Sequence, residues 1–583
     1  MPDPLHPPPP PASPTAPTAA RAMSRGRAAL VLALLALGAV LSVARWPWLA
    51  TPEPVAESGV ERVQCVSYAP FRRPGETPFD PLAFVDERRI EIDLKALAPL
   101  TGCVRTYSVS QGLDAVPRVA RRLGMTVLLG AWIGRNAAEN EQELARAIAL
   151  VREERDAIQA LIVGNEVMLR RELPEATLVG LIERTRAAVD VPVTYADVWE
   201  FWLQHPSIAP AVSFVTIHTL PYWEDHPVGI DHAIAHVLEV TRSMRARLPG
   251  KEILVGEAGW PSEGRARRDA VPGRVEQARF VRQFVRAADE HGLRYNLIEA
   301  FDQPWKRALE GAMGGYWGLL DSDARPKFGW HGPVAARADG RSGPWAALAA
   351  ALLLGGGLAW AGLRAARAGG RAPLAPVALH GLIGAAAGAG LGATLAEQWR
   401  YMTVWNRNPI EWGASGATTA VALLACAAAA VWLARRISGT GEAPAVVPGM
   451  ARTLRDWLRS DRAPGPDGLL GLVFGLVLFG AAVTAVLHGF DARYRGFPWP
   501  LFGPPALAAA LVWAAGLRRA EDAVEERVLA AVIAAGALVM LWKEGWPNLQ
   551  AVGYAALLLV LGGACAARTS TSRPSSAATD AGS

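Results

Sequence analysis

The sequence predicts a chain in two parts, a (β/α)8 barrel of the α/β class followed by an all-α polytopic transmembrane domain. Three observations carry this prediction. Short apolar runs alternate with charged, helical stretches over residues 61–335, as they do in parallel βα units. About eight such repeats in roughly 270 residues fit a closed barrel better than a doubly wound sheet. From residue 344 onward, the apolar runs reach the length that crosses a bilayer.

The composition agrees with a soluble part joined to a membrane part. Hydrophobic residues make up 51% of the 583 residues, while charged residues still make up 19%. The net charge of +5 is small for this length. No basic block with interleaved aromatic residues occurs, so we expect no nucleic-acid partner.

The first 50 residues predict a disordered segment and then a membrane anchor. Residues 1–20 consist mainly of Pro, Ala, Ser and Thr, a composition that forms no packed core. Residues 21–50 join a basic flank to an apolar run, which is typical of a signal anchor. Because Ser42-Val43-Ala44 fits a small-x-small cleavage site poorly, we expect an uncleaved helix that places the following residues beyond the membrane.

The predicted barrel strands are eight short apolar runs. They span residues 63–68, 103–109, 126–133, 161–167, 191–199, 213–223, 252–260 and 295–305. Amphipathic stretches between them, such as residues 141–155 and 275–292, predict helices that cover the barrel.

The four cysteines predict no metal site. Cys65 and Cys103 lie on the first two predicted strands; a disulfide between them is compatible with a location outside the cytoplasm, but we expect two buried thiols. Cys426 and Cys565 lie in apolar runs and are expected to pack there. None of the four has a CxxC or CxxxH spacing, so a zinc site is not expected.

The C-terminal half predicts about seven membrane helices over residues 344–567, followed by a disordered cytoplasmic tail, residues 568–583. The apolar runs span residues 344–363, 374–396, 414–434, 468–487, 499–517, 528–542 and 549–567. Several are rich in Ala and Gly, which permits close helix packing in lipid.

Loop charges predict the topology. Basic residues gather in the loops near residues 364–371, 435–462 and 518–527. These loops fall on the cytoplasmic side if the barrel is outside and both termini are inside, as the positive-inside rule requires. The opposite loops carry interfacial aromatic residues, including Trp399 and Trp546.

Two of the predicted strands lead into a glutamate. LIVGNEV contains Glu166 at the end of the fourth strand, and ILVGEAGW contains Glu257 at the end of the seventh. Barrel active sites form at the carboxyl ends of strands, and strands four and seven lie nearly across the mouth. Two opposed carboxylates are what glycosidic bond cleavage uses. The alternative is that one glutamate caps a helix and the other is an exposed loop acid.

The motifs around these glutamates resemble a known family. VGNEV (163–167) and VGEAGWPSEG (255–264) resemble the two signature motifs of family 17 glycoside hydrolases, the β-1,3-glucanase and β-1,3-glucanosyltransferase family. HTLPYWED (218–225) and EAFDQPWK (299–306) are similar to those of its bacterial, membrane-attached branch. The resemblance spans nearly all of residues 61–330.

The sequence departs from the plant members at two positions. Those members have GETGWPS-like and YPYF-like versions of the motifs, whereas Ala258 replaces the Thr here and Leu220 replaces the first Tyr. Both acids are present, so the departures bear on the sugar subsites.

The resemblance implies that Glu166 is the general acid/base and Glu257 the nucleophile, with retention through a covalent glucosyl-enzyme. We expect burial and the charge of its partner to raise the pKa of Glu166, and hydrogen-bond donors to keep Glu257 ionised. This chemistry needs carboxylates and water or an acceptor hydroxyl, so no metal or cofactor is expected.

Further polar residues on strand ends are expected to bind substrate or tune the acids. Asn165 is placed to hydrogen-bond the sugar 2-hydroxyl. Tyr222 could donate to Glu257, and His218 could do the same, line the cleft or be a satisfied barrel histidine.

Glu299 and Tyr107 complete the polar set. Glu299 could bind a hydroxyl, tune Glu257, or pair with Arg105 or another barrel cation. Tyr107 ends the second strand and is expected to contact substrate.

Tryptophans near the catalytic rim are expected to give flat platforms for sugar rings, although any single one could simply pack. We expect at least two of the set to stack on glucose. The set comprises Trp199, Trp202, Trp260, Trp305 and Trp317.

These observations together predict an enzyme of the bacterial inner membrane whose periplasmic barrel hydrolyses or transglycosylates β-1,3-glucan, with both termini cytoplasmic. The expected partners are a β-glucan, the lipid bilayer and a glucan synthase. Two alternatives remain: a non-catalytic glucan receptor coupled to the membrane helices, and a β-1,4-glycanase of the same barrel clan.

Overall fold

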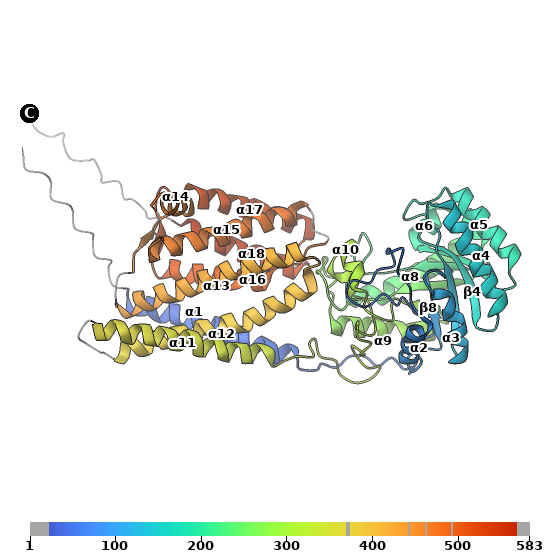
Figure 1. Ribbon diagram of the computed structural model, residues 1–583, viewed down its shortest axis with the longest axis horizontal. Helices are drawn as coiled ribbons and strands as arrows, with labels where there is room; N and C mark the ends of the chain where they lie inside the picture. Colours follow the sequence, from blue (N-terminus) through green and yellow to red (C-terminus); the bar gives the residue numbers. More distant parts are fainter. Residues whose placement is uncertain (1–22, 369–373, 441–442, 461–462, 491–493, 568–583) are drawn as a thin grey trace, which may run out of the picture.

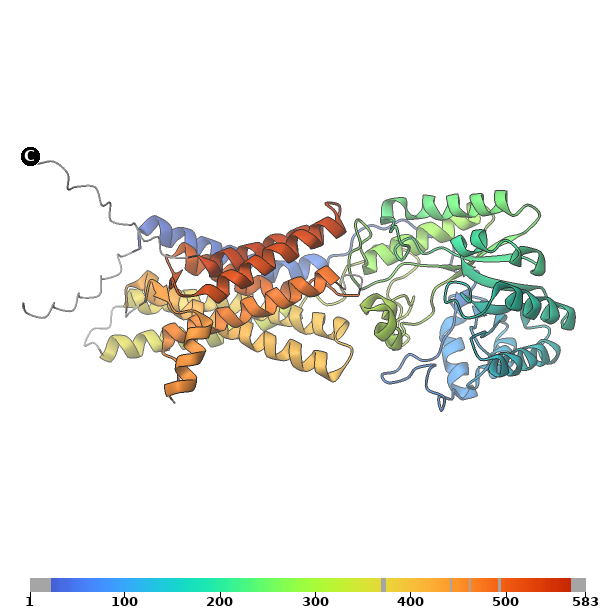
Figure 2. The same ribbon diagram turned by 90° about the horizontal axis from the view of Figure 1, so that it is seen from above.

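The structure is a computed structural model that describes residues 23–368, 374–440, 443–460, 463–490 and 494–567. A barrel and a helical domain lie end to end along the long axis (Figures 1 and 2). The predicted disordered segments, residues 1–20 and 568–583, lie outside the described residues.

The barrel is closed and wholly parallel. Its strands follow chain order from β1 to β8, and β8 pairs back with β1 through Leu297 and Val66. The strands are β1 (Val66–Ser67), β2 (Cys103–Arg105), β3 (Thr126–Ala131), β4 (Ile158–Asn165), β5 (Val193–Val198), β6 (Val215–His218), β7 (Ile253–Ala258) and β8 (Arg294–Leu297). All eight predicted strands are confirmed.

The strands are shorter than predicted because several apolar runs continue past the sheet. The run 213–223 is an example: β6 ends at His218, and the next residues turn into the loop at the barrel mouth. Such residues remain buried, like Tyr222 at 1% exposure, so their hydrophobicity does not distinguish strand from loop.

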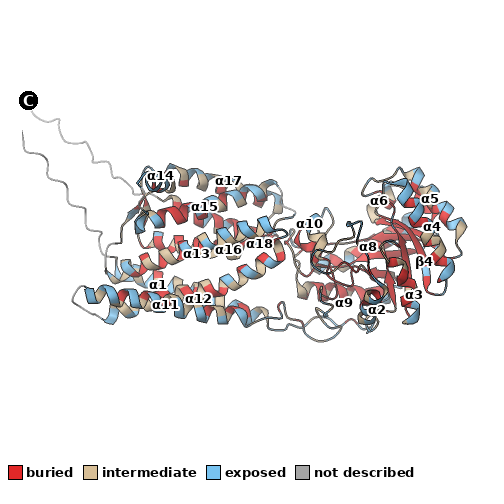
Figure 3. Ribbon diagram, in the orientation of Figure 1, coloured by how far each residue is buried: buried red, intermediate tan, exposed pale blue. Residues whose placement is uncertain are grey.

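Amphipathic helices cover the barrel, and buried residues concentrate in the strands and on the inner helix faces (Figure 3). The predicted helices 141–155 and 275–292 correspond to α4 and α9. The barrel helices are α2 (Glu87–Leu97), α3 (Val116–Arg122), α4 (Ala137–Glu153), α5 (Glu175–Ala188), α6 (Trp199–Gln204), α7 (Ile208–Ala211), α8 (Ile230–Arg247), α9 (Arg274–Glu290) and α10 (Arg307–Glu310), with 3-10 turns η1 (Leu113–Ala115), η2 (Pro304–Lys306) and η3 (Ala312–Gly315).

Cys65 and Cys103 form a disulfide, so the expectation of two free buried thiols is wrong. The register pairs Val66 with Val104, which sets the preceding cysteines side by side on neighbouring strands. Their Cα atoms are 4.5 Å apart, within the range that a disulfide spans. Strand register, which the sequence alone does not show, decides the outcome.

Nine helices and a two-stranded ladder make up the described part of the helical domain. The helices are α1 (Arg25–Leu49), α11 (Ser342–Ala368), α12 (Leu374–Trp405), α13 (Pro409–Ser438), α14 (Met450–Ser460), α15 (Pro466–Phe490), α16 (Trp499–Ala514), α17 (Val524–Glu544) and α18 (Leu549–Ala566). Strands β9 (Val446–Val447) and β10 (Arg518–Arg519) form the ladder. Each of the seven predicted apolar runs lies on a helix, and α1 packs among helices from the far end of the chain.

Six helices of the described chain are long and apolar enough to cross a membrane: α1, α11, α12, α13, α15 and α18. Their length and their apolar composition alone identify these helices as candidate membrane spans. The membrane topology and the uncleaved state of α1 therefore stay predictions. The two-residue strands of the ladder are too short to give a pattern, and α14 was not predicted although its sequence is amphipathic.

The barrel contacts the helical domain through the loops that follow β6, β7 and β8. After β6, the ring of Trp223 lies 6.4 Å from that of Tyr494. After β8, Arg307 donates to the Asn406 carbonyl over 2.7 Å. The loop after β7 makes the largest set of contacts, from Glu263, Arg265 and Ala266 to Arg400, Arg495, Glu544 and Asn548.

Candidate active site

Glu166 follows the last residue of β4 in a left-handed turn. Its φ is +54°, and that of Gly164 is +86°. A non-glycine residue in this region is uncommon and is concentrated at functional sites. A Cβ on Gly164 would lie 2.8 Å from Val167 Cγ2, so glycine lets the chain turn here. The Glu166 N–H still donates to the Ala196 carbonyl over 2.7 Å.

Glu257 lies on β7 itself and is 5% exposed. Gly256 precedes it, and a Cβ there would lie 2.3 Å from Thr216 Cγ2 on β6. Glycine therefore permits the close approach of β6 and β7 beside the carboxylate. Both stretches, Val163–Glu166 and Val255–Glu257, thus use a glycine for backbone geometry close to an acid.

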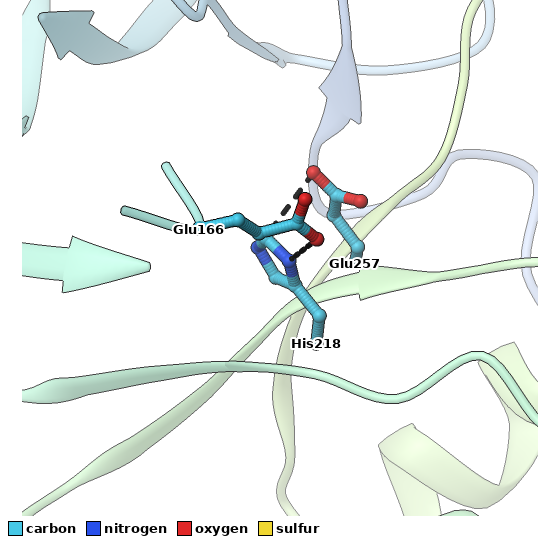
Figure 4. Close-up of side chains that lie close together, drawn as sticks. All are labelled: Glu166, His218 and Glu257. Atoms are coloured by element: carbon cyan, nitrogen blue, oxygen red, sulfur yellow. Dashed lines mark hydrogen bonds and ion pairs between the residues drawn. The ribbon is translucent and has the colours of Figure 1, made fainter. Parts of the chain in front are cut away.

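The two carboxylates point toward one another across His218 (Figure 4). His218 Nδ1 is 2.9 Å from Glu166 Oε1, and His218 Nε2 is 3.6 Å from Glu257 Oε1. One side-chain atom of each residue lies within 4.8 Å of the other two. This spacing is close to the roughly 5–5.5 Å that retaining glycosidases use and well below the roughly 6.5–9.5 Å of inverting ones.

Arg105 on β2 is the central cation of the site. It is 1% exposed, and its Nη1 donates to the Gly256 carbonyl over 2.7 Å and to Glu257 Oε1 over 3.2 Å. Its Nη2 donates to Asn165 Oδ1 over 2.6 Å. Sequence reasoning considered Arg105 only as a partner of Glu299, so its contact with Glu257 was missed.

Arg105 also determines the proton position on His218. Both guanidinium nitrogens lie 3.4 Å from His218 Nε2. Two donors facing Nε2 require it to be the acceptor, so Nδ1 carries the proton and donates to Glu166. The histidine thus bridges the two acids rather than simply filling the barrel.

Tyr107, rather than Tyr222, donates to Glu257. The Tyr107 hydroxyl is 2.8 Å from Glu257 Oε1, and burial, with the charge of Glu257, raises its pKa well above the usual value. It therefore remains a donor. The Tyr222 hydroxyl donates to the Arg265 carbonyl over 2.7 Å, which corrects its expected role. Tyr222 turns toward the β7 loop, away from the acids.

The pKa of Glu166 is lowered, contrary to expectation. Burial raises it, but the hydrogen bond from His218 and the electrostatic interactions with His218, Arg170 and Arg105 together outweigh burial. The free site therefore holds Glu166 as a carboxylate. A substrate must disturb these contacts, or supply its own, for Glu166 to act as an acid.

Glu299 pairs with Lys306, one of the possibilities left open by the sequence. Lys306 Nζ lies 2.7 Å from Glu299 Oε2. Burial raises the pKa of Glu299 to about 7, although Lys306 opposes the rise. Its Oε1 is buried without a hydrogen-bond partner among the described residues, so this oxygen can still accept a hydrogen bond from a sugar hydroxyl.

Three tryptophans of the expected platform set are buried. Trp260 is 0% exposed and its indole donates to the Val271 carbonyl; Trp202 and Trp317 are 1% and 2% exposed. These three support the barrel, which corrects their expected platform role. Trp199 and Trp305 are half-buried and stay candidates.

An additional platform candidate is Trp132, which follows β3. It is 37% exposed, and the Arg170 guanidinium lies 4.3 Å from its ring centroid. Its place after a strand end, in TVLLGAWI, was the signal available in the sequence.

Glu166, His218 and Glu257 also form a cluster of metal-ligand types. A cation already lies beside two of the three residues, because Arg105 Nη1 is 3.2 Å from Glu257 Oε1 and 3.4 Å from His218 Nε2. These three residues therefore fit a pair of acids beside a guanidinium group better than they fit a metal centre.

The fold and the site define a class: a (β/α)8 barrel that presents two opposed glutamates, as glycosidic bond cleavage requires. Residues 65–318 match the family model of the BtgE/BtgC glycoside hydrolase domain. The barrel is thus similar to the glycoside hydrolase domain of this family, and the resemblance predicted from its motifs is confirmed.

Curated relatives are similar to the chain over the barrel. A probable beta-glucosidase, btgE, of Aspergillus fumigatus is 28% identical over 225 residues, 38% of this chain and 39% of the relative. A putative glucan endo-1,3-beta-glucosidase, btgC, of Aspergillus niger is 25% identical over 46% of this chain and 42% of its own length. A glucan 1,3-beta-glucosidase of Schizosaccharomyces pombe is 27% identical over 40% of this chain and 78% of its own length.

Among solved structures, a beta-1,3-glucanosyltransferase of Rhizomucor miehei, an active-site mutant in complex with laminaritriose, is 21% identical. The similarity covers 47% of this chain and 98% of that one, with a TM-score of 0.41.

Proposed function

We propose that the barrel is a retaining glycosidase or transglycosylase that acts on β-1,3-glucan, with Glu257 as nucleophile and Glu166 as acid/base. The observation that carries the proposal is the approach of the two carboxylates to within 4.8 Å. The names of the curated relatives support a β-1,3-glucan substrate.

The contacts of the two acids support this division of labour. Glu257 accepts hydrogen bonds from Arg105 and Tyr107, and such donors stabilise the ionised form that attacks the anomeric carbon. Glu166 is more open, its side chain being 23% exposed against 6% for Glu257. Exposure suits the group that must exchange protons with the leaving oxygen and then with water or an acceptor.

The first step attaches glucose to Glu257 while Glu166 gives a proton to the leaving oxygen. Asn165, oriented by Arg105 through Oδ1, is proposed to donate from Nδ2 to the sugar 2-hydroxyl oxygen. In the second step, Glu166 removes a proton from water or from a sugar hydroxyl, and the covalent bond to Glu257 breaks. Water gives hydrolysis, and a sugar hydroxyl gives transfer.

The proposed location is the periplasmic side of the membrane. The Cys65–Cys103 disulfide is of a kind that persists outside the cytoplasm. The helical domain supplies candidate membrane spans, and its contacts with the β6, β7 and β8 loops turn the catalytic end of the barrel toward it.

The test uses the full chain in detergent with laminari-oligosaccharides, and records product lengths and linkages. We expect shorter products from hydrolysis and longer or branched ones from transfer, and no products from Glu257→Gln. Glu252→Gln is the matched control, because Glu252 precedes the same strand, is exposed and pairs with Arg294. If Glu257→Gln and the native chain give the same products, the barrel is not the enzyme. Binding without any product favours the receptor, and cleavage restricted to β-1,4 oligosaccharides favours the β-1,4-glycanase.

A further inference from the structure

A cavity of about 280 Å³ lies within the helical domain, between α1, α12, α13 and α16. No barrel residue lines it, so it is separate from the catalytic pair. Much of its wall is small or apolar, with Gly38, Gly390 and Gly503 on three different helices. The volume is near the lower end of the roughly 300–1,000 Å³ typical of small-molecule pockets. Three of the four lining helices are candidate membrane spans. If they cross a bilayer, the cavity lies beside the lipid acyl chains.

One end of the cavity is polar. Ser42 and Arg45 line it from the last turns of α1, and Thr394 and Glu397 from the last turns of α12. Arg45 is exposed, with no hydrogen bond or ion pair to any described residue. Glu397 pairs through Oε1 with Arg337 over 2.5 Å, but its Oε2 is buried and has no partner in the described chain. Both groups retain hydrogen-bonding capacity for a ligand.

The ion pairs at this end leave Arg45 out. Arg337 pairs with Glu397, and Arg400 pairs with Glu263 of the barrel. Arg45 therefore has no ion pair to a described residue. An unpaired cation beside an apolar cavity complements an amphiphile with an anionic head.

We propose that this cavity binds one anionic glycerophospholipid, with an acyl chain between α1, α12 and α16 and the phosphodiester at Arg45. A headgroup hydroxyl donates to Glu397 Oε2. Phosphatidylglycerol offers a net negative charge and a headgroup hydroxyl, whereas phosphatidylcholine, whose choline cation balances its phosphodiester, offers no net charge and no headgroup hydroxyl. The lipid joins α1, which leads into the barrel, to the end of α12, which contacts the barrel, and so helps to hold the barrel at the membrane.

The test adds phosphatidylglycerol or phosphatidylcholine to the delipidated full chain in neutral detergent, and counts bound lipid by native mass spectrometry. We expect one retained phosphatidylglycerol and a raised thermal unfolding midpoint. Arg45→Gln should weaken phosphatidylglycerol binding roughly fivefold, the factor that ~1 kcal/mol per basic residue gives, and leave phosphatidylcholine unchanged. Arg25→Gln, the same change at the opposite end of α1, is the control. Equal retention by native chain and Arg45→Gln overturns the assignment of the headgroup.

A second variant tests the acyl chain. Ala387 lines the cavity, and Ala387→Leu should fill part of it and reduce the retained lipid. Gly416→Leu is the control, because a Cβ at Gly416 on α13 meets open space. If Ala387→Leu retains as much phosphatidylglycerol as Gly416→Leu, or if the native chain retains both lipids equally, the site is not this cavity.

Discussion

Around the two glutamates, the Arg105 guanidinium group contacts three neighbouring side chains and fixes their orientation or hydrogen bonding. Arg105 stabilises the Glu257 carboxylate, orients the Asn165 amide and directs the His218 proton to Nδ1. Because the charge is buried, these contacts are little screened by water. In the proposed mechanism, these contacts prepare Glu257 for attack, while Glu166 is held ionised until substrate arrives.

The pH dependence of activity tests the role of His218. Glu166 must be protonated to give the leaving oxygen its proton, so kcat/KM falls as pH rises through the Glu166 pKa, which His218 helps to lower. His218→Ala removes the donor, raises that pKa and moves the alkaline limb to higher pH. The loss of rate should be smaller than the roughly hundredfold or more that loss of a general acid causes.

The pH profiles of the native chain and of His236→Ala provide the comparison, because His236 is half-buried and pairs with Glu224 rather than with Glu166. An alkaline limb that stays in place in His218→Ala would show that this histidine does not control Glu166.

The sequence located the two acids but not the residues that serve them. Glu166 and Glu257 follow Val-Gly at strand ends, a pattern visible without coordinates. Arg105 is the last residue of β2, and whether such a side chain points into the barrel or out depends on register. For the same reason, the sequence predicted Tyr222 as the possible donor to Glu257, whereas the structure shows that Tyr107 is the donor.

At the scale of single elements, β7 is tightly constrained beside the nucleophile. Gly256 lies against Thr216 Cγ2 of β6, and its carbonyl accepts hydrogen bonds from Arg105 and Asn296. A strand held on both sides cannot shift to admit a larger residue, so packing fixes the position of Glu257.

Substitution at Gly256 tests this constraint. Gly256→Ala should destabilise the barrel by about 1–3 kcal/mol, the usual cost of overpacking, measured by chemical unfolding. Thr216→Ser removes the opposing Cγ2 atom, so the double variant should recover part of the loss. Gly180→Ala on α5, where a Cβ meets open space, is the control and should be neutral or stabilising. A double variant as unstable as Gly256→Ala alone would contradict the proposed clash.

Elements with strong periodicity were predictable, and short ones were not. All eight barrel strands and the long helices follow from apolar patterning. The β9–β10 ladder has two residues per strand, so it depends on tertiary contacts that no local pattern records. The Cys65–Cys103 pairing depends on register for the same reason. Helix α14 is short but amphipathic, with Leu454, Trp457 and Leu458 at helical spacing, and this signal was available in the sequence.

In the whole molecule, the loop after β7 connects the nucleophile to the helical domain. Arg265 is 3% exposed; it pairs with Glu544, donates to the Arg495 carbonyl over 2.7 Å, and lies 4.4 Å from the Phe497 ring centroid. Its own carbonyl accepts from Tyr222. The helical domain therefore supports the catalytic rim as well as supplying candidate membrane spans.

Removing this buried cation tests the support. Arg265→Ala leaves Glu544 without its partner, and should cost about 3–5 kcal/mol, as breaking a buried ion pair does. We expect a lower thermal unfolding midpoint and faster proteolysis of the loop after β7. Arg294→Ala breaks the exposed pair with Glu252 and should cost about 0–1 kcal/mol. If the two variants lower stability equally, the buried Arg265–Glu544 pair contributes no more to stability than the exposed Arg294–Glu252 pair.

The central claim is that Glu166 and Glu257 cleave a glycosidic bond with retention. The most direct measurement is the anomeric form of the first product released from a laminari-oligosaccharide, followed by NMR before mutarotation. The account predicts the β-anomer, because two inversions at one carbon restore the original configuration. Release of the α-anomer would contradict it, since a single displacement by water would then be the mechanism.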